Sequence, residues 1–176
     1  MARSRRLRLE GYLRSLFVYA YSLSQSREDA ADLVQDCALR ALSARHAPDD
    51  EAAYRAWLFR VVRHLHIDSR RRATREVRRD RAASLGREEA NLRLRDESIV
   101  NAITVQRGLE KLKPAQREVI ALVDMAGFSY EEAAAVLDVP AGTLMSRLHR
   151  ARRCLLAIVS QDNVYVLEPH RNRRPG

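Results

Sequence analysis

Residues 128–152 read FSYEEAAAVLDVPAGTLMSRLHRAR, and this stretch decides the fold of the C-terminal part of the chain. Ser129 and Glu132 form a capping box, in which each side chain satisfies a backbone N–H of the other residue, so a helix is predicted over 130–137. Asp138 then supplies a residue that tolerates the left-handed conformation of a tight turn. A longer helix follows, and this succession of short helix, turn and longer helix predicts a helix-turn-helix.

The longer helix of this pair is expected over about 141–159 and is the candidate DNA-binding element. It has no acidic residue between Pro140 and Arg153, so it would not repel phosphate. A helical hairpin with a solvated basic face would share part of this pattern, but the capped start and the tight turn favour DNA binding. Phosphate contacts and plain solvation explain Arg152 and Arg153 equally well. The side chains expected at the DNA are Ser146, Arg147, His149, Arg150 and Arg153.

Hydrophobic residues also recur at helical spacing in the N-terminal part, over about 9–24, 28–45 and 52–72. The apolar stripe of the third segment is expected to face a core. Its members are Tyr54, Trp57, Leu58, Val61, Val62 and Leu65. The other side of the same segment carries Arg60, Arg63, His64, Ile67 and Arg71.

The predicted fold class is therefore all-α, with two small helical domains joined by a linker. An N-terminal helical bundle is expected over 9–78, a polar linker over 79–98 and a C-terminal helix-turn-helix domain over 99–159. The last residues, 160–176, show no periodicity and are predicted to form a flexible tail. Within the C-terminal domain, two further helices are expected before the helix-turn-helix, over about 99–111 and 114–125.

Composition narrows the class of protein. The 176 residues include 32 Lys and Arg against 23 Asp and Glu, and the net charge of +9 favours a nucleic-acid partner. Cys37 and Cys154 lack metal-ligand spacing and are expected to be buried or half-buried thiols in a reduced compartment. We find no catalytic constellation and no phosphate-cradling glycine loop, so no enzyme activity, cofactor or metal is expected. Without a signal peptide or an apolar run that could span a bilayer, the expected location is the cytoplasm.

Three segments together resemble one family, the extracytoplasmic-function sigma factors of the sigma-70 family. Residues 128–152 resemble its helical domain that reads the −35 promoter element. Residues 30–42, AADLVQDCALRAL, resemble its helix that docks on the clamp helices of RNA polymerase. Residues 54–72, YRAWLFRVVRHLHIDSRRR, resemble its −10-recognising segment. The segments follow the order of the family and span about residues 10–158.

The resemblance implies a factor that binds RNA polymerase core and directs it to promoters by recognising −10 and −35 elements. The implied partners are the clamp helices of the largest polymerase subunit, the flap of the second, promoter DNA and an anti-sigma factor, with no membrane. The loop 43–53 would capture a flipped promoter base. His64 stands where the family usually has Asn, and Met145 where relatives often carry a basic residue. The polymerase-binding residues implied are Asp32, Gln35 and Asp36. The −10-binding residues implied are Arg60, Arg63, His64, Ile67 and Arg71.

Two other functions fit part of the sequence. A helix-turn-helix regulator that acts without polymerase would explain the basic helix, but not the acidic face at Asp32 and Asp36. A sigma-like decoy that binds an anti-sigma factor would explain that acidic face, but it would leave the acid-free helix without a purpose.

Overall fold

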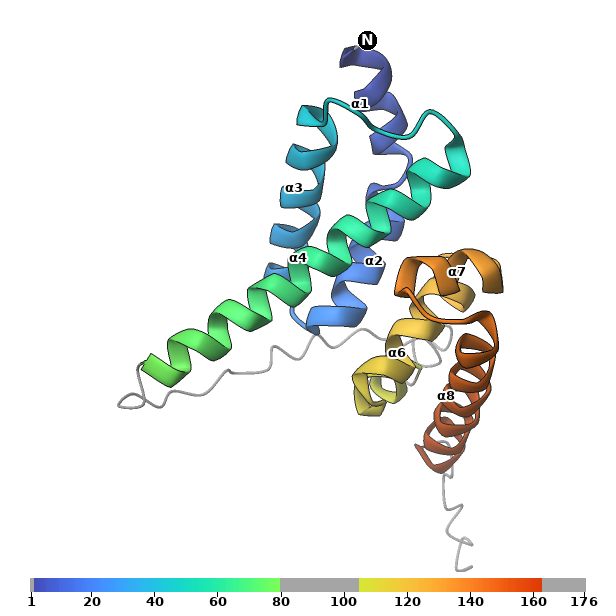
Figure 1. Cartoon of the computed structure of the whole chain (residues 1–176). Helices are drawn as coiled ribbons and strands as arrows, with labels where there is room; N and C mark the ends of the chain where they lie inside the picture. The colour runs from blue at the N-terminus through green and yellow to red at the C-terminus, as the bar shows by residue number, and fades with distance from the viewer. Residues whose placement is uncertain (1, 80–104, 163–176) are drawn as a thin grey trace, which may run out of the picture.

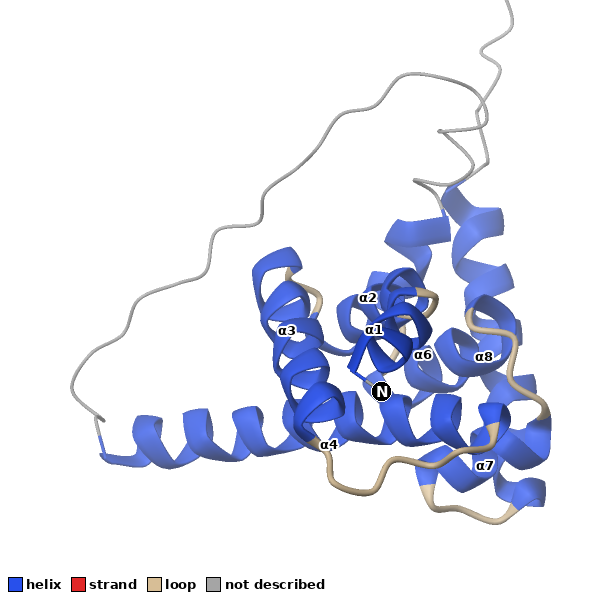
Figure 2. Cartoon of the chain, turned by 90° about the horizontal axis from the view of Figure 1, so that it is seen from above, coloured by secondary structure: helices blue, strands red, loops and turns tan. Residues whose placement is uncertain are grey.

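The computed structural model describes residues 2–79 and 105–162, and every regular element within these ranges is helical, which confirms the all-α fold class (Figures 1 and 2). The elements of the N-terminal domain are α1 (Ala2–Glu10), α2 (Leu13–Ser24), α3 (Arg27–Ser43) and α4 (Glu51–Arg79). The C-terminal domain starts with a helical segment over 105–111. It continues with α6 (Pro114–Ile120), the π-helix η1 (Ala121–Met125), α7 (Tyr130–Leu137) and α8 (Ala141–Asp162).

The first predicted helix, over 9–24, is two helices in the structure, so the prediction of one continuous helix is wrong. The break lies at Gly11, where the N–H of Tyr12 donates to the carbonyl of Leu9 at 2.9 Å. The hydroxyl of Tyr12 also donates to the carboxylate of Glu51, at the start of α4. The chain therefore turns at Gly11 and Tyr12 and is held there by a contact that is distant in sequence.

Helix α4 confirms the apolar stripe that the sequence predicts. Tyr54, Leu58, Val62 and Leu65 are buried in the core of the N-terminal domain, and the rest of the stripe is partly buried. The helix continues to Arg79, further than the predicted end near residue 72, and its basic C-terminal half projects beyond the packed helices (Figures 1 and 2).

The helix predicted over 114–125 changes its geometry half-way. It is α-helical to Ile120 and then forms the π-helical turn η1, in which the N–H of Ala126 donates to the carbonyl of Ala121 at 2.9 Å. Gly127, with a φ of 70°, ends the element, as predicted. The π-helical turn η1 therefore comes directly before the short connection that leads to Phe128 and the helix-turn-helix.

The helix-turn-helix itself has the predicted local structure. Ser129 Oγ accepts from the N–H of Glu132 at 3.2 Å, and the Glu132 carboxylate accepts from the N–H of Ser129 at 2.8 Å. Asp138 adopts the left-handed conformation, with φ 56° and ψ 53°. Both the capping box and the turn are confirmed. The sequence could predict them because each depends only on neighbouring residues.

The two cysteines differ in their exposure to solvent. Cys37 is fully buried, as expected, and burial raises the pKa of its thiol to about 12. Cys154 is exposed, so the expectation of a buried or half-buried thiol is wrong for this residue. It lies on a flank of α8 where the amide of Gln116 reaches it, with 3.4 Å between nitrogen and sulfur.

The two domains pack against each other, which the sequence did not predict. Helices α2 and α4 contact α6, η1 and α7, and the buried side chains of both domains form a continuous core (Figure 2). The predicted linker 79–98, apart from its first residue, lies outside the described residues. The predicted tail is described only as far as the end of α8, which extends to residue 162 rather than 159.

Candidate nucleic-acid interface

The exposed face of α8 carries the residues that the sequence assigns to DNA binding. Ser146, His149, Arg150 and Arg153 are exposed, whereas Arg147 is partly buried. Ser146 Oγ donates to the carbonyl of Thr143 at 2.9 Å, and Arg150 Nε donates to the carbonyl of Ser146 at 3.2 Å. These contacts lie within α8, so the side chains share one accessible face of a single helix.

The opposite face of α8 is fixed by packing. Leu144, Leu148 and Ala151 are buried, with at most 2% of each residue exposed. Ala133 and Ala134 of α7 are also buried, and their small side chains allow the two helices of the motif to approach closely. The basic face of α8 therefore has a fixed orientation relative to the rest of the C-terminal domain.

Arg152 is engaged away from the basic face, by a partner that neither of the two alternatives for this residue included. Its guanidinium forms a bidentate ion pair with Asp124 of η1, with 3.1 Å from Nε to one carboxylate oxygen. Hydrogen bonding to this carboxylate raises the pKa of Arg152. The pair ties α8 to η1, and the sequence analysis missed Asp124 because nothing in its neighbourhood indicates a partner 28 residues away.

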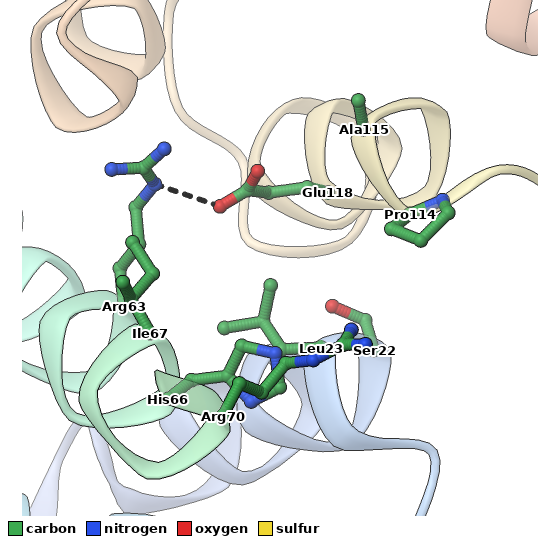
Figure 3. Close-up of a pocket in the computed structure, with 9 residues that line it drawn as sticks. All are labelled: Ser22, Leu23, Arg63, His66, Ile67, Arg70, Pro114, Ala115 and Glu118. Carbon is green, nitrogen blue, oxygen red and sulfur yellow. Dashed lines mark hydrogen bonds and ion pairs between the residues drawn. The ribbon is translucent and has the colours of Figure 1, made fainter. Parts of the chain in front are cut away.

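A second basic face follows α4. Arg60, His64 and Arg71 are exposed there, while Arg63 and Ile67 are partly buried. The Nε of Arg63 donates to Glu118 Oε1 of α6 at 2.9 Å, so this arginine is already paired with a carboxylate (Figure 3). The structure thus brings the five predicted residues onto one helix face but leaves only three of them freely accessible.

A cavity of about 290 Å³ lies where α4, α2 and α6 meet (Figure 3). Arg63, His66 and Arg70 line it from α4, and Glu118 lines it from α6. Burial and the neighbouring Arg70 lower the pKa of His66, which favours the neutral imidazole. The cavity belongs to the contact between the two domains.

The third predicted site is an acidic face on α3. Asp32, Gln35 and Asp36 are exposed, and the opposite side of the helix buries Leu33 and Cys37 in the core. The helix starts at the N-cap Ser26, whose Oγ accepts from the N–H of Asp29 at 3.2 Å. The acidic face is thus rigidly presented by a capped and well-packed helix. Leu39, 59% exposed, and Leu42, 44% exposed, add apolar area to the same helix.

The loop between α3 and α4 is held by a residue that the sequence analysis missed. Arg8 of α1 donates to the carbonyls of Pro48, Asp49 and Asp50 at 2.9–3.0 Å, and to the Glu51 carboxylate at 2.7 Å. Its guanidinium also lies 4.0 Å from the centre of a tyrosine ring at the start of α4. No sequence signal marks Arg8, because its partners are about 40 residues away.

Within the described ranges, no group of three or more His, Cys, Asp or Glu side chains is arranged to hold a metal ion. No helix of residues 2–79 or 105–162 is long and apolar enough to cross a membrane.

Two segments match known protein families. Residues 9–76 match sigma-70 region 2, and residues 103–155 match sigma-70 region 4. The matched segments contain the faces described above, with α3 and α4 in the first and the helix-turn-helix in the second.

Relatives match over most of the chain. The chain is 36% identical over 162 residues to the ECF RNA polymerase sigma factor EcfG of Rhodopseudomonas palustris, covering 88% of this chain and 84% of that protein. It is 34% identical over 141 residues to the ECF RNA polymerase sigma factor SigC of Mycobacterium tuberculosis, covering 77% of this chain and 72% of that protein.

Two solved structures share the fold. The sigma factor RpoE in complex with the anti-sigma factor NepR from Bartonella quintana has a TM-score of 0.67 and 30% identity, over 89% of this chain and 97% of that one. CnrH in complex with the cytosolic domain of CnrY has a TM-score of 0.65 and 28% identity, over 92% and 91% of the respective chains.

Proposed function

The chain belongs to the extracytoplasmic-function sigma factors of the sigma-70 family. On that premise we propose which of its exposed faces binds RNA polymerase and which faces contact promoter DNA. As a sigma factor it binds RNA polymerase core and directs promoter-specific initiation through −10 and −35 elements. The observation that carries the proposal is the presence of three exposed faces of different character, on α3, α4 and α8, within the two matched regions.

The acidic face of α3 is the proposed polymerase-docking surface. Asp32, Gln35 and Asp36 would meet the clamp helices of the largest subunit. Charge complementarity at such a contact mainly sets association rate and specificity. An acidic face on a protein with a net charge of +9 supports a protein partner here, because DNA would be repelled.

The two basic faces are the proposed promoter-reading surfaces. On α8, Ser146, Arg147, His149, Arg150 and Arg153 would enter the major groove at −35 or contact its phosphates. On α4, Arg60, Arg63, His64, Ile67 and Arg71 would contact the −10 element. Arginine suits both tasks, since its planar guanidinium can bind guanine or phosphate through two hydrogen bonds.

The loop predicted over 43–53, of which residues 44–50 lie between α3 and α4, is the proposed place where a flipped promoter base is captured. Extruding a base from the stack costs a few kcal/mol, which contacts in the pocket must offset. A loop that is already held by Arg8 would need less ordering when the base arrives. This supports a rigid receptor rather than a loop that folds on binding.

We infer that the chain acts by positioning polymerase and DNA, without catalysis or a cofactor, and that it works in the cytoplasm where the polymerase is found. The solved complex of the sigma factor RpoE with the anti-sigma factor NepR supports an anti-sigma partner for this chain as well. A sigma factor accounts for the acidic face of α3 and the basic faces of α4 and α8 together. A polymerase-independent regulator would account only for the basic faces, and a decoy only for the acidic face.

Run-off transcription with purified polymerase core and a library of promoter sequences tests the proposed function. We expect transcripts only when the full-length protein and core are both present, and enriched promoters should share −35 and −10 elements. Tight promoter binding without core in a gel-shift experiment would instead indicate a polymerase-independent regulator. Absence of transcription from every promoter, despite core binding, would indicate a decoy.

A further inference from the structure

We propose that Arg152 and Asp124 are positioning residues for −35 recognition: they hold α8 in the orientation at which its exposed side chains read bases, without contacting DNA themselves. The inference rests on the proposed function, because it takes α8 as the helix that reads the −35 element. It goes beyond that function in assigning part of the −35 selectivity to two residues outside the reading face.

The ion pair joins the middle of α8 to the π-helical turn η1. Arg152 Nε donates to one carboxylate oxygen of Asp124 at 3.1 Å, and a terminal nitrogen of the same guanidinium donates to the other oxygen. The two side chains are 48% and 34% exposed, and a pair at this exposure with a single contact would contribute little. Two parallel hydrogen bonds, however, fix the relative direction of the two groups as well as their distance. The pair is therefore suited to orienting one element relative to the other.

Tyr130, the first residue of α7, completes the cluster around the Arg152 guanidinium. Its hydroxyl accepts a hydrogen bond from Arg152. The hydrogen bond to Asp124 raises the pKa of Arg152 most, burial opposes this rise, and the bond to Tyr130 adds a smaller one. One side chain of α8 is thus bound to both η1 and α7, so three successive elements of the domain meet at one group.

Apolar packing alone leaves the orientation of α8 less well defined. Leu144, Leu148 and Ala151 are buried on its inner face. Hydrophobic contacts are non-directional, so a small rotation of α8 about its own axis keeps most of them. Arg152 follows Ala151 directly, at the edge of this buried stripe. A directional contact at that place sets the rotation that the apolar contacts leave open.

The reading side chains are close enough to Arg152 to depend on this orientation. At about 1.5 Å per residue, Ser146 lies about 9 Å from Arg152 along the helix axis, and Arg150 lies about 3 Å from it. Recognition requires side chains to be held within about 0.5 Å and 10–20° of the productive geometry. Phosphate contacts carry no sequence information, whereas base contacts do. Loss of the pair should therefore reduce discrimination between −35 sequences more than it reduces binding as a whole.

The competing role for Arg152 is a phosphate contact, since it lies between the exposed Arg150 and Arg153. The two roles differ in their dependence on salt. Each phosphate that a protein neutralises adds about 0.9 to the slope of log K against log salt concentration, because a counterion is released. A guanidinium that is already paired with Asp124 adds nothing to that slope.

Competitive run-off transcription with polymerase core and the full chain tests the positioning role. The templates are one active promoter and two versions of it, with a substitution in the −35 or in the −10 element. Asp124→Asn should lower discrimination against the −35 substitution about fivefold or more, the lower end of what one bidentate base contact provides. Arg152→Lys should do the same, because it keeps the charge but loses the two-pronged geometry. Discrimination at −10 should stay unchanged in both variants.

The −10 template is the internal control, since a general loss of stability would affect both elements. Equal losses at −10 and −35, or no loss at −35, would overturn the proposal. Glu131→Gln is the matched control for charge, because it removes an exposed carboxylate of α7 in the same domain. It should leave both discrimination ratios unchanged.

The salt dependence of promoter binding by the complex of core and chain separates positioning from phosphate binding. Arg152→Gln should leave the slope unchanged, whereas Arg150→Ala should make it shallower by about 0.9. A change of about 0.9 in Arg152→Gln would make this residue a phosphate contact and overturn the proposal. The two proposals fail differently: absence of −35 discrimination in the original sequence defeats the proposed function. Discrimination that survives both Asp124→Asn and Arg152→Lys defeats only the positioning role.

Discussion

The rings of Phe59 and Phe128 meet edge to face, with their centres 4.8 Å apart and their planes at 75°, and they join helix α4 to the turn that precedes the helix-turn-helix. One ring belongs to the region that matches sigma-70 region 2 and the other to the region that matches region 4. The N-terminal and C-terminal domains therefore share one core, and changes at this contact affect both.

A double-mutant cycle measures this contact. Phe59→Ala and Phe128→Ala should each lower the free energy of unfolding by about 3–5 kcal/mol, because each removes a buried aromatic side chain. The double variant should lose about 0.5–1.5 kcal/mol less than the sum, since edge-to-face pairs have a specific interaction energy of this size. Urea unfolding followed by circular dichroism gives the four values. Strict additivity would show that the rings do not interact in solution.

The acidic face of α3 is tested by charge reversal. Asp32→Arg together with Asp36→Arg should weaken binding to polymerase core by about 100-fold or more, because like charges facing each other across an interface cost several kcal/mol. Pull-down with purified core at a series of concentrations measures the effect. The matched control is Asp49→Arg with Glu131→Arg, which changes the net charge equally at two other exposed positions. Normal core binding by the first variant would refute the docking assignment.

On the recognition helix, Arg147→Ala should weaken promoter use by about 1–3 kcal/mol, the value for loss of a bidentate base contact. Run-off transcription from promoters with each −35 position varied should show relaxed discrimination at one position. Arg14→Ala, at an exposed arginine of α2, loses the same charge far from α8 and should leave discrimination unchanged. A uniform loss across all promoters would assign Arg147 to a phosphate instead.

The contact between Arg8 and the loop before α4 predicts an effect on the stability of the protein and an effect on the melting of promoter DNA. Arg8→Ala removes hydrogen bonds to three loop carbonyls, so the free energy of unfolding should fall by about 1–3 kcal/mol. Formation of the open promoter complex, measured by permanganate reactivity of unpaired thymines, should decrease as well. Arg6→Ala is the control, because its side chain is 76% exposed and, among the described residues, pairs with Glu10 of the same helix. If Arg8→Ala opened the promoter fully, the loop that Arg8 holds would not be the place where the flipped base is captured.

His66 predicts a dependence of stability on pH. The folded chain lowers the pKa of His66 from the usual 6.5, first through burial and then through Arg70; Asp29 opposes this shift, and Arg117 adds a smaller lowering. Below pH 6.5 the unfolded chain therefore takes up a proton that the folded chain resists, and the free energy of unfolding should fall as the pH decreases. Above pH 6.5 the contribution disappears, because the imidazole is neutral in both states.

Thermal melts between pH 5 and pH 8 test this sign. His66→Gln should show a smaller decrease in melting temperature on acidification than the original sequence. His149→Gln, at an exposed position of α8, is the matched control and should show the original decrease. An unchanged acid sensitivity in His66→Gln would mean that this imidazole does not contribute.

Much of the fold follows from the sequence, because its signals are local. The capping box at Ser129, the left-handed turn at Asp138 and the apolar stripe of α4 depend on residues within a few positions of one another, and all three are confirmed. The grouping of basic side chains on α4 and α8 and of acidic ones on α3 follows from helical periodicity in the same way. Their assignment to −10, −35 and polymerase stays a prediction, supported by membership of the family.

Only the tertiary structure decided which of these side chains are accessible and which are held by others. Arg63 and Glu118 are 55 residues apart. Phe59 lies beside the predicted apolar stripe, yet it is fully buried, because Tyr19 of α2 and Phe128 of the second domain cover its ring. The partners of Arg8 and Asp124 are 40 and 28 residues away in sequence. Periodicity tells which residues share a face of a helix, but it carries no information about which other element covers that face. That choice is made by the packing of whole domains, and it brings the carboxylate of Glu118, in the C-terminal domain, onto Arg63 on the basic face of α4.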